Sequence, residues 1–190
     1  MPRRGECRKT TPCFPKGYED IVGHIVTEAN FFTPSETYRA WAEKSGAQFC
    51  YISASPWQLF PPLTEFVNLN GFPTAAFYLK KFRWKDQSFL SLFESPDKYK
   101  PAVIEPLLKQ FPRRQFVLVG DAGERDPEIY ANLARRYPQQ VVRILIRDVT
   151  GEPADSERYQ AAFRGLPPRL WQVFRAPAEI VDSCPPRPGG

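Results

Sequence analysis

The fold of this chain is decided by the stretch Phe116-Val117-Leu118-Val119-Gly120-Asp121-Ala122-Gly123-Glu124-Arg125-Asp126. Its first four residues are apolar, which is typical of a strand buried on both faces. A turn with two glycines follows, and residues 127–137 then carry an amphipathic pattern that predicts a helix. A buried strand, a short turn and a helix together form the repeating unit of a parallel α/β sheet.

The rest of the chain repeats this alternation. Apolar runs predict strands over 21–26, 49–52, 75–82, 116–119, 141–146 and 170–174. Helices are expected between them, over 34–46, 55–70, 99–111, 127–137 and 155–165. Ser55 is the expected N-cap of the second helix, and Pro101 is expected to open the third directly after Lys100. The expected fold class is α/β, with a largely parallel sheet flanked by helices.

Two aspartates, Asp121 and Asp126, lie five residues apart on the turn that leaves the buried strand. In open α/β sheets ligands bind beyond the carboxyl ends of the strands. Carboxylates at such a place can hold a hard cation such as Mg²⁺. The alternative is a capped helix start, with Asp126 as N-cap and Pro127 as the first helical residue. That alternative accounts for Asp126 only, so Asp121 points to a cation site.

The composition narrows the class of protein. A chain of 190 residues with a net charge of +5 can bury one sizeable domain core. No apolar run approaches the ~20 residues of a membrane span, and no signal-peptide core follows Met1. The four cysteines form no CxxC pair, so a reducing, cytoplasmic location is expected. The single histidine, His24, excludes a His-rich zinc site.

Three regions are expected along the chain. Residues 1–19 form a basic, proline-punctuated segment that is disordered or loosely docked, 20–182 form the folded domain, and 183–190 form a disordered Pro/Gly tail. The basic segment suits an anionic membrane surface, and a solvated tail is the alternative. No nucleic-acid partner is expected, because the aromatic residues lie inside periodic apolar segments.

Polar residues at the strand and helix ends form a constellation that suits phosphoryl transfer. Ser53 ends one predicted strand, and its hydroxyl can hold a phosphate oxygen. Lys100 lies at a predicted helix start and can neutralise charge on a phosphoryl group. Asp121 and Asp126 can hold Mg²⁺, which bridges to phosphate.

Five ordered segments closely resemble one known catalytic domain, over 51–59, 98–100, 111–121, 124–130 and 146–149. The family is that of the actin-patch-associated phosphatidate phosphatases, in the haloacid dehalogenase superfamily. The resemblance implies a Rossmann-like haloacid dehalogenase fold and Mg²⁺-dependent conversion of phosphatidate to diacylglycerol by way of an aspartyl-phosphate. It further implies that Ser53 binds phosphate and that Lys100, rather than Lys98, is the catalytic and phosphate-binding lysine. Asp121 and Asp126 would position the Mg²⁺ ion.

The resemblance breaks at the nucleophile. The superfamily places it in an Asp-x-Asp-x-Thr motif at the end of the first strand, and this sequence has no such motif. The nearest catalytic candidate is Asp20, with Val22 in place of the second aspartate. Asp20 precedes the apolar run 21–26 and would lie at the wrong end of that strand, whereas Glu28 and Asn30 follow it. The first strand of the family fold is therefore expected to be altered or missing.

Three interpretations remain open at this point. The chain is a lipid-phosphate phosphatase with an altered first motif, or a non-catalytic relative that binds Mg²⁺ and phospholipid headgroups or acts as an adaptor. The third is a truncated or alternatively started copy of such an enzyme. In each, the expected partner is a phospholipid, with peripheral contact to membranes, and the oligomeric state is not fixed by the sequence.

Overall fold

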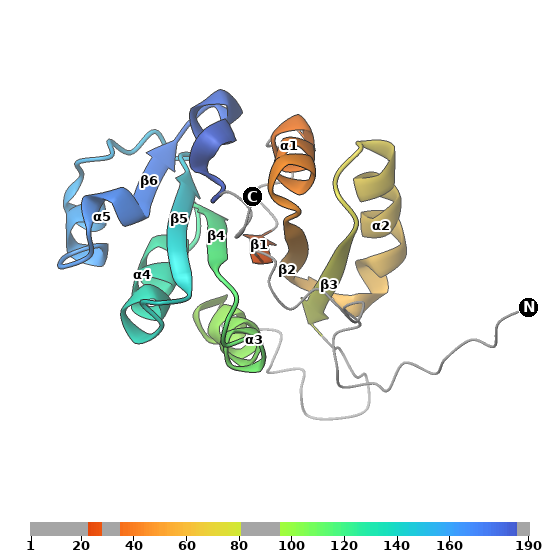
Figure 1. Cartoon of the computed structure of the whole chain (residues 1–190), viewed down its shortest axis with the longest axis horizontal. Helices are drawn as coiled ribbons and strands as arrows, with labels where there is room; N and C mark the ends of the chain where they lie inside the picture. Colours follow the sequence, from red (N-terminus) through yellow and green to blue (C-terminus); the bar gives the residue numbers. More distant parts are fainter. Residues whose placement is uncertain (1–22, 28–34, 81–95, 186–190) are drawn as a thin grey trace, which may run out of the picture.

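Six parallel strands form one sheet in the described part of the chain, in the order β3-β2-β1-β4-β5-β6 (Figure 1). The computed structural model describes residues 23–27, 35–80 and 96–185. The strands are β1 (Gly23–Thr27), β2 (Gln48–Pro56), β3 (Ala75–Lys80), β4 (Phe116–Asp121), β5 (Val141–Arg147) and β6 (Trp171–Phe174). The α-helices are α1 (Ser35–Ser45), α2 (Phe60–Leu69), α3 (Pro96–Gln110), α4 (Asp126–Arg136) and α5 (Glu157–Ala162), and 3₁₀ segments are η2 (Trp57–Leu59), η4 (Pro168–Leu170) and η5 (Pro177–Ser183). The predicted α/β class, with parallel strands flanked by helices, is confirmed.

Both faces of the sheet are buried, because successive side chains of its central strands point to opposite sides. On β4, Leu118 packs in a core with α3, α4 and α5, while its neighbour Val119 packs in a second core with α1, α2 and η5. On β2, Ile52 packs in the first of these cores and its neighbour Tyr51 packs in the second. Figure 1 shows the two groups of helices on the two sides of the sheet. The continuous apolar run over 116–119 therefore follows from burial on both sides.

The strand order reverses at β1. The chain builds outward from β1 to β2 and β3 on one side, then returns to place β4, β5 and β6 on the other. The strand predicted over 21–26 is thus present as β1, five residues long and hydrogen-bonded to both β2 and β4. In open parallel sheets the crevice at such a reversal, outside the carboxyl ends of the strands, is where ligands bind.

The predicted N-cap role of Ser55 is wrong. β2 continues through Ser55 to Pro56, and the following helical segment has extended Pro56 as its N-cap with no side-chain cap hydrogen bond. The backbone N–H of Ser55 donates instead to Oγ of Ser53 at 2.8 Å. The hydroxyl of Ser53 therefore closes a local turn at the end of β2.

Two helix starts also differ from expectation. Helix α3 begins at Pro96, so Pro101 lies inside it and Lys100 lies in its second turn. Helix α4 has Arg125 as its N-cap and Asp126 as its first residue, which corrects the predicted N-cap role of Asp126. Pro127 is the second residue of α4, where its missing N–H breaks no helical hydrogen bond, whereas Pro101 lies inside α3.

Several predictions fall outside the described residues. They are the basic segment 1–19, the last two residues of the strand predicted over 75–82, and the end of the tail at 186–190. Within the described part of the chain, no helix is long and apolar enough to cross a membrane.

Candidate functional site

The carboxyl ends of β2, β1 and β4 meet at one edge of the sheet. Thr27, the last residue of β1, pairs with Ile52, and Val26 pairs with Val119. Ser53 and Asp121 therefore both lie one residue beyond the level of Thr27. Since β1 lies between their strands, two strand spacings separate them, about 10 Å.

The segment 121–126, which we call the acidic turn, is closed by its own aspartates. Oδ1 of Asp121 accepts a hydrogen bond from the backbone N–H of Gly123 at 2.8 Å, and Oδ2 of Asp126 accepts one from the backbone N–H of Asp121 at 3.0 Å. Asp121 is 3 % exposed and Asp126 is fully buried. The backbone N–H of Ala122 donates to the carbonyl of Arg147 at 2.9 Å, which ties the turn to the end of β5. The turn is thus fixed before any ligand binds.

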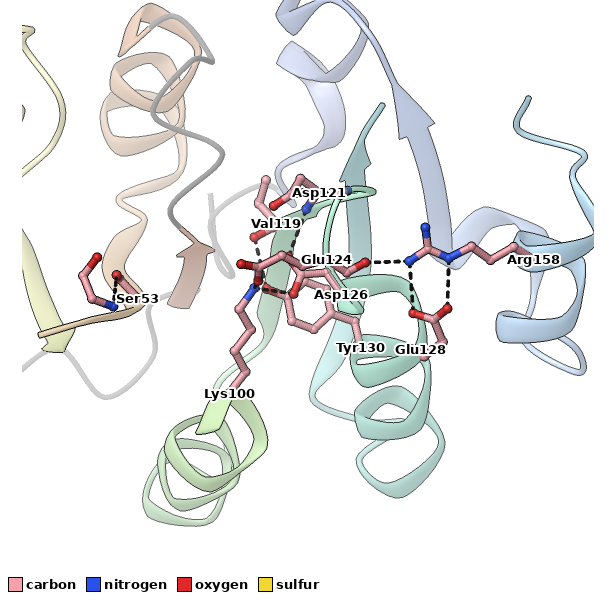
Figure 2. Close-up of polar contacts among 11 residues, drawn as sticks. Ser53, Lys100, Val119, Asp121, Glu124, Asp126, Glu128, Tyr130 and Arg158 are labelled. Carbon is pink, nitrogen blue, oxygen red and sulfur yellow. Dashed lines mark hydrogen bonds and ion pairs between the residues drawn. The ribbon is translucent and has the colours of Figure 1, made fainter. Parts of the chain in front are cut away.

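Lys100 reaches the acidic turn from α3. Its Nζ lies 2.5 Å from Oδ1 of Asp126 and 2.5 Å from Oε2 of Glu124 (Figure 2). Lys100 is 2 % exposed, so its ammonium group is compensated by these two carboxylates rather than by water. Lys98, the second candidate lysine, is exposed.

Burial and charge act in opposite directions in this cluster. Burial raises the pKa of Asp126 to about 6, against the lowering effect of Lys100. Burial also raises the pKa of Asp121. Burial alone would lower the pKa of Lys100, but Asp126 and Glu124 outweigh it and the net shift is upward, so the ammonium form persists at neutral pH. One ammonium group faces three carboxylates, which leaves the cluster net negative when all are ionised.

The donor set fits a hard divalent cation. Asp121, Glu124 and Asp126 each offer a carboxylate oxygen, and these oxygens lie within 4.8 Å of one another. Oxygen ligands of this kind suit Mg²⁺. Each carboxylate oxygen has two lone pairs, so Asp126 can keep its hydrogen bonds and still face a cation.

The predicted site residues are therefore placed in two groups. Lys100, Asp121 and Asp126 come together, whereas Ser53 lies at the same edge of the sheet on the other side of β1 (Figure 2). The catalytic candidate Asp20, together with Glu28 and Asn30, lies outside the described residues. β1 runs from Gly23 toward this edge and reaches it at Thr27, so Asp20 precedes the strand in the sequence and Glu28 follows it.

Two residues at the site were missed from the sequence. Glu124 contacts Lys100, and its place between two aspartates on a turn was a usable signal. Arg158, on α5, donates hydrogen bonds to backbone carbonyls of the acidic turn more than 30 residues away, and no local pattern marks it. Asp148, which follows β5, forms an ion pair with Arg175 at 2.7 Å.

Together, the fold and the site define a class: a Rossmann-like α/β protein with a lysine-bound acidic cluster beside the point where the strand order reverses. Within that class, the chain belongs to the family of the phosphatidate phosphatase APP1 catalytic domain, whose family model matches residues 15–148. The family predicted from the sequence is confirmed.

Two curated relatives agree with this assignment. The chain is 33% identical over 146 residues to phosphatidate phosphatase APP1 of Saccharomyces cerevisiae, covering 77% of this chain and 24% of that protein. It is 33% identical over 103 residues to an uncharacterised protein of Schizosaccharomyces pombe, covering 54% of this chain and 16% of that protein. The chain thus matches less than a quarter of the length of either relative. No solved structure matches it at a significant level.

Proposed function

We propose that residues 20–182 form a phosphatidate phosphatase domain that removes phosphate from a lipid phosphate in a Mg²⁺-dependent reaction. The observation that carries this proposal is the buried contact of Lys100 with Asp126 and Glu124, beside Asp121 at the carboxyl edge of the sheet. A cation and a cation-binding carboxylate set, held side by side, are what a phosphoryl group requires. The family of the chain supports the choice of phosphatidate as substrate.

Each residue has a separate role in this proposal. Asp121 and Asp126, with Glu124, hold Mg²⁺, which when bound polarises the phosphoryl oxygens and offsets their charge. Lys100 places its ammonium group toward the same phosphoryl oxygens and is held there by Asp126. Ser53 binds a phosphate oxygen from the other side of β1. A phosphate held between Ser53 and the cation that Asp121 would bind would lie over the end of that strand.

The nucleophile is the open part of the proposal, and the candidate from the sequence is Asp20. Because β1 reaches the site edge at Thr27, a carboxylate that follows β1 in the sequence must be tested together with Asp20. Glu28 is that carboxylate.

The phospholipid substrate also requires that the domain work at a membrane surface, as a peripheral protein.

The test is phosphate release from phosphatidate in detergent micelles, with Mg²⁺ and with EDTA. Asp121→Asn should lose at least about 10²-fold in rate, the usual size of an electrostatic contribution of this kind. Asp155→Asn, at an exposed aspartate, is the matched control and should keep the wild-type rate. Asp20→Asn and Glu28→Gln identify the nucleophile by which of them abolishes release.

Two outcomes would count against the proposed Mg²⁺-dependent phosphatase activity. Release that is unaffected by EDTA and by Asp121→Asn would refute the metal-dependent site. No release by the wild-type chain, with Mg²⁺ binding retained by calorimetry, would refute the phosphatase and leave a domain that binds a cation without hydrolysing phosphatidate.

A further inference from the structure

Arg158 binds backbone carbonyls of the acidic turn through its planar guanidinium group (Figure 2). Its Nη1 donates to the carbonyl of Ala122 at 2.7 Å, and its Nη2 donates to the carbonyl of Glu124 at 2.6 Å. Its Nε donates to Oε1 of Glu128 at 3.0 Å, and Oε2 of Glu152 lies 3.6 Å from Nη1. The fork of an arginine fits several acceptors in one plane at once, which a lysine cannot do.

The two carbonyls held by Arg158 belong to the part of the turn that sets the acidic side chains. The peptide unit between Ala122 and Gly123 carries the N–H that donates to Oδ1 of Asp121. A peptide unit is planar, so fixing its carbonyl also fixes the direction of its N–H. The carbonyl of Glu124 lies on the residue that supplies the third carboxylate. Arg158 thus acts on the direction of two cation-binding side chains without touching either carboxylate.

The charge of Arg158 is offset locally. Glu128 pairs with its Nε, and Glu152 lies beside its Nη1. Without these two carboxylates, the positive charge of Arg158 would repel a metal ion bound by the acidic turn and weaken its binding. With two carboxylates of its own, Arg158 can hold the turn while leaving the three site carboxylates to a metal ion.

Arg158 also lies outside the residues that match the family model. That match covers residues 15–148, whereas Arg158 belongs to α5, which packs against α4. The segment after β5 therefore does more than add β6 to the sheet. It also supplies contacts to the turn that carries the proposed metal ligands.

We propose that Arg158 is a positioning residue that holds the acidic turn in the geometry that binds a divalent cation. The inference rests on the proposed function for the identity of that cation. The positioning itself can be tested without any metal present.

The test compares full-length wild type, Arg158→Lys and the matched control Arg164→Lys, an exposed arginine seven residues from the α5 start. The first readout is amide hydrogen exchange in the metal-free protein. In Arg158→Lys the amide of Gly123 should exchange roughly tenfold faster, because one or two charge-assisted hydrogen bonds are lost. The amides of Val117 and Leu118 in β4 should be unchanged in all three proteins.

The second readout is Mg²⁺ binding by calorimetry. Arg158→Lys should bind Mg²⁺ about tenfold more weakly, the size of effect that residues orienting metal ligands commonly have. Arg164→Lys should bind as the wild type does. Phosphate release should then be recovered in Arg158→Lys at high Mg²⁺ concentration, since the ligands themselves are intact.

The outcomes separate this inference from the proposed function. If the wild-type protein binds no Mg²⁺, the proposed metal site is refuted. The exchange rate of the Gly123 amide would still decide whether Arg158 positions the turn. Unchanged exchange and unchanged affinity in Arg158→Lys would overturn the positioning role. Faster exchange throughout β4 as well as the turn would also overturn it, because the effect would then be a loss of global stability.

Discussion

Gly120 sits where the acidic turn leaves no room for a side chain. A methyl group at this position would lie 2.3 Å from Oδ2 and 2.7 Å from Cβ of Asp126. Real Cβ atoms do not approach other atoms this closely, so Gly120→Ala must displace Asp126. The backbone of Gly120 has no positive φ, and the effect is therefore one of contact rather than of backbone strain.

Two contributions set the size of the effect. Inserting a methyl group into a packed site destabilises by about 1–3 kcal/mol. Moving Asp126 also breaks its hydrogen bond from the backbone N–H of Asp121, and a buried hydrogen bond to a charged group is worth about 1.5–3 kcal/mol. Because the two effects share one displacement, we expect Gly120→Ala to lower the free energy of unfolding by roughly 3 kcal/mol.

Urea unfolding followed by tryptophan fluorescence measures this change. With a slope of about 2 kcal/mol per molar urea, the midpoint should fall by roughly 1.5 M with the slope unchanged. Gly151→Ala is the matched control, since Gly151 has φ of +76° and no atom within 4 Å of the added methyl group. That control should lose only about 1 kcal/mol, from backbone conformation. If Gly120→Ala is no more destabilising than Gly151→Ala, the argument from contact with Asp126 is refuted.

Two further variants test the charges of the described chain. Lys100→Met should lower the free energy of unfolding by about 3–5 kcal/mol at pH 7 and abolish phosphate release, because buried Asp126 loses its counter-charge; an unchanged urea midpoint would contradict this. Asp148→Asn should lower the free energy of unfolding by about 1–2 kcal/mol at pH 7, since Asp148 accepts hydrogen bonds from Arg175 and from backbone N–H groups such as that of Gly151. Burial alone would raise the pKa of Asp148, but these partners lower it below the unfolded value of about 3.9, so its stabilisation is present above pH 4 and is lost as the pH falls through the folded pKa. The difference between Asp148→Asn and wild type should therefore shrink as the pH falls below 4, and a difference that stays constant on acidification would contradict this sign.

The alternation of strands and helices was predictable because the central strand β4 is buried along its whole length, on both faces of the sheet. Burial on both faces makes a strand a continuous apolar run, as at 116–119, and such runs stand out in a sequence. Helix starts were less predictable, since Pro127 is compatible with more than one position in a first turn and Pro101 lies inside α3 instead of opening it. The cap assigned to Ser55 failed because β2 continues to Pro56, and no local pattern distinguishes a long strand from a strand followed by a cap.

Part of the site was predictable for the same reason. Asp121 follows a buried strand directly, and its role at the sheet edge follows from that position. Lys100 was named from its place at a predicted helix start and from the family resemblance, but its contacts were not predictable, since Asp126 and Glu124 lie more than 20 residues away. Arg158 had neither a local pattern nor a family motif, because contacts across the fold leave no periodic signal in a sequence.

The two partners of Lys100 differ in a way that bears on how the site would accept a phosphate. A buried ion pair is weak evidence of stability, because an apolar replacement of similar volume is often as stable. Its value here lies in placing a charge in advance of the ligand. Asp126 is fully buried and also bonded to the backbone of Asp121, so it holds Lys100 firmly. The side chain of Glu124 is 37 % exposed, so it is held less firmly and can release Lys100. A phosphate oxygen that takes the place of Glu124 would therefore meet an ammonium group already directed at it, and the desolvation of Lys100 would have been completed during folding.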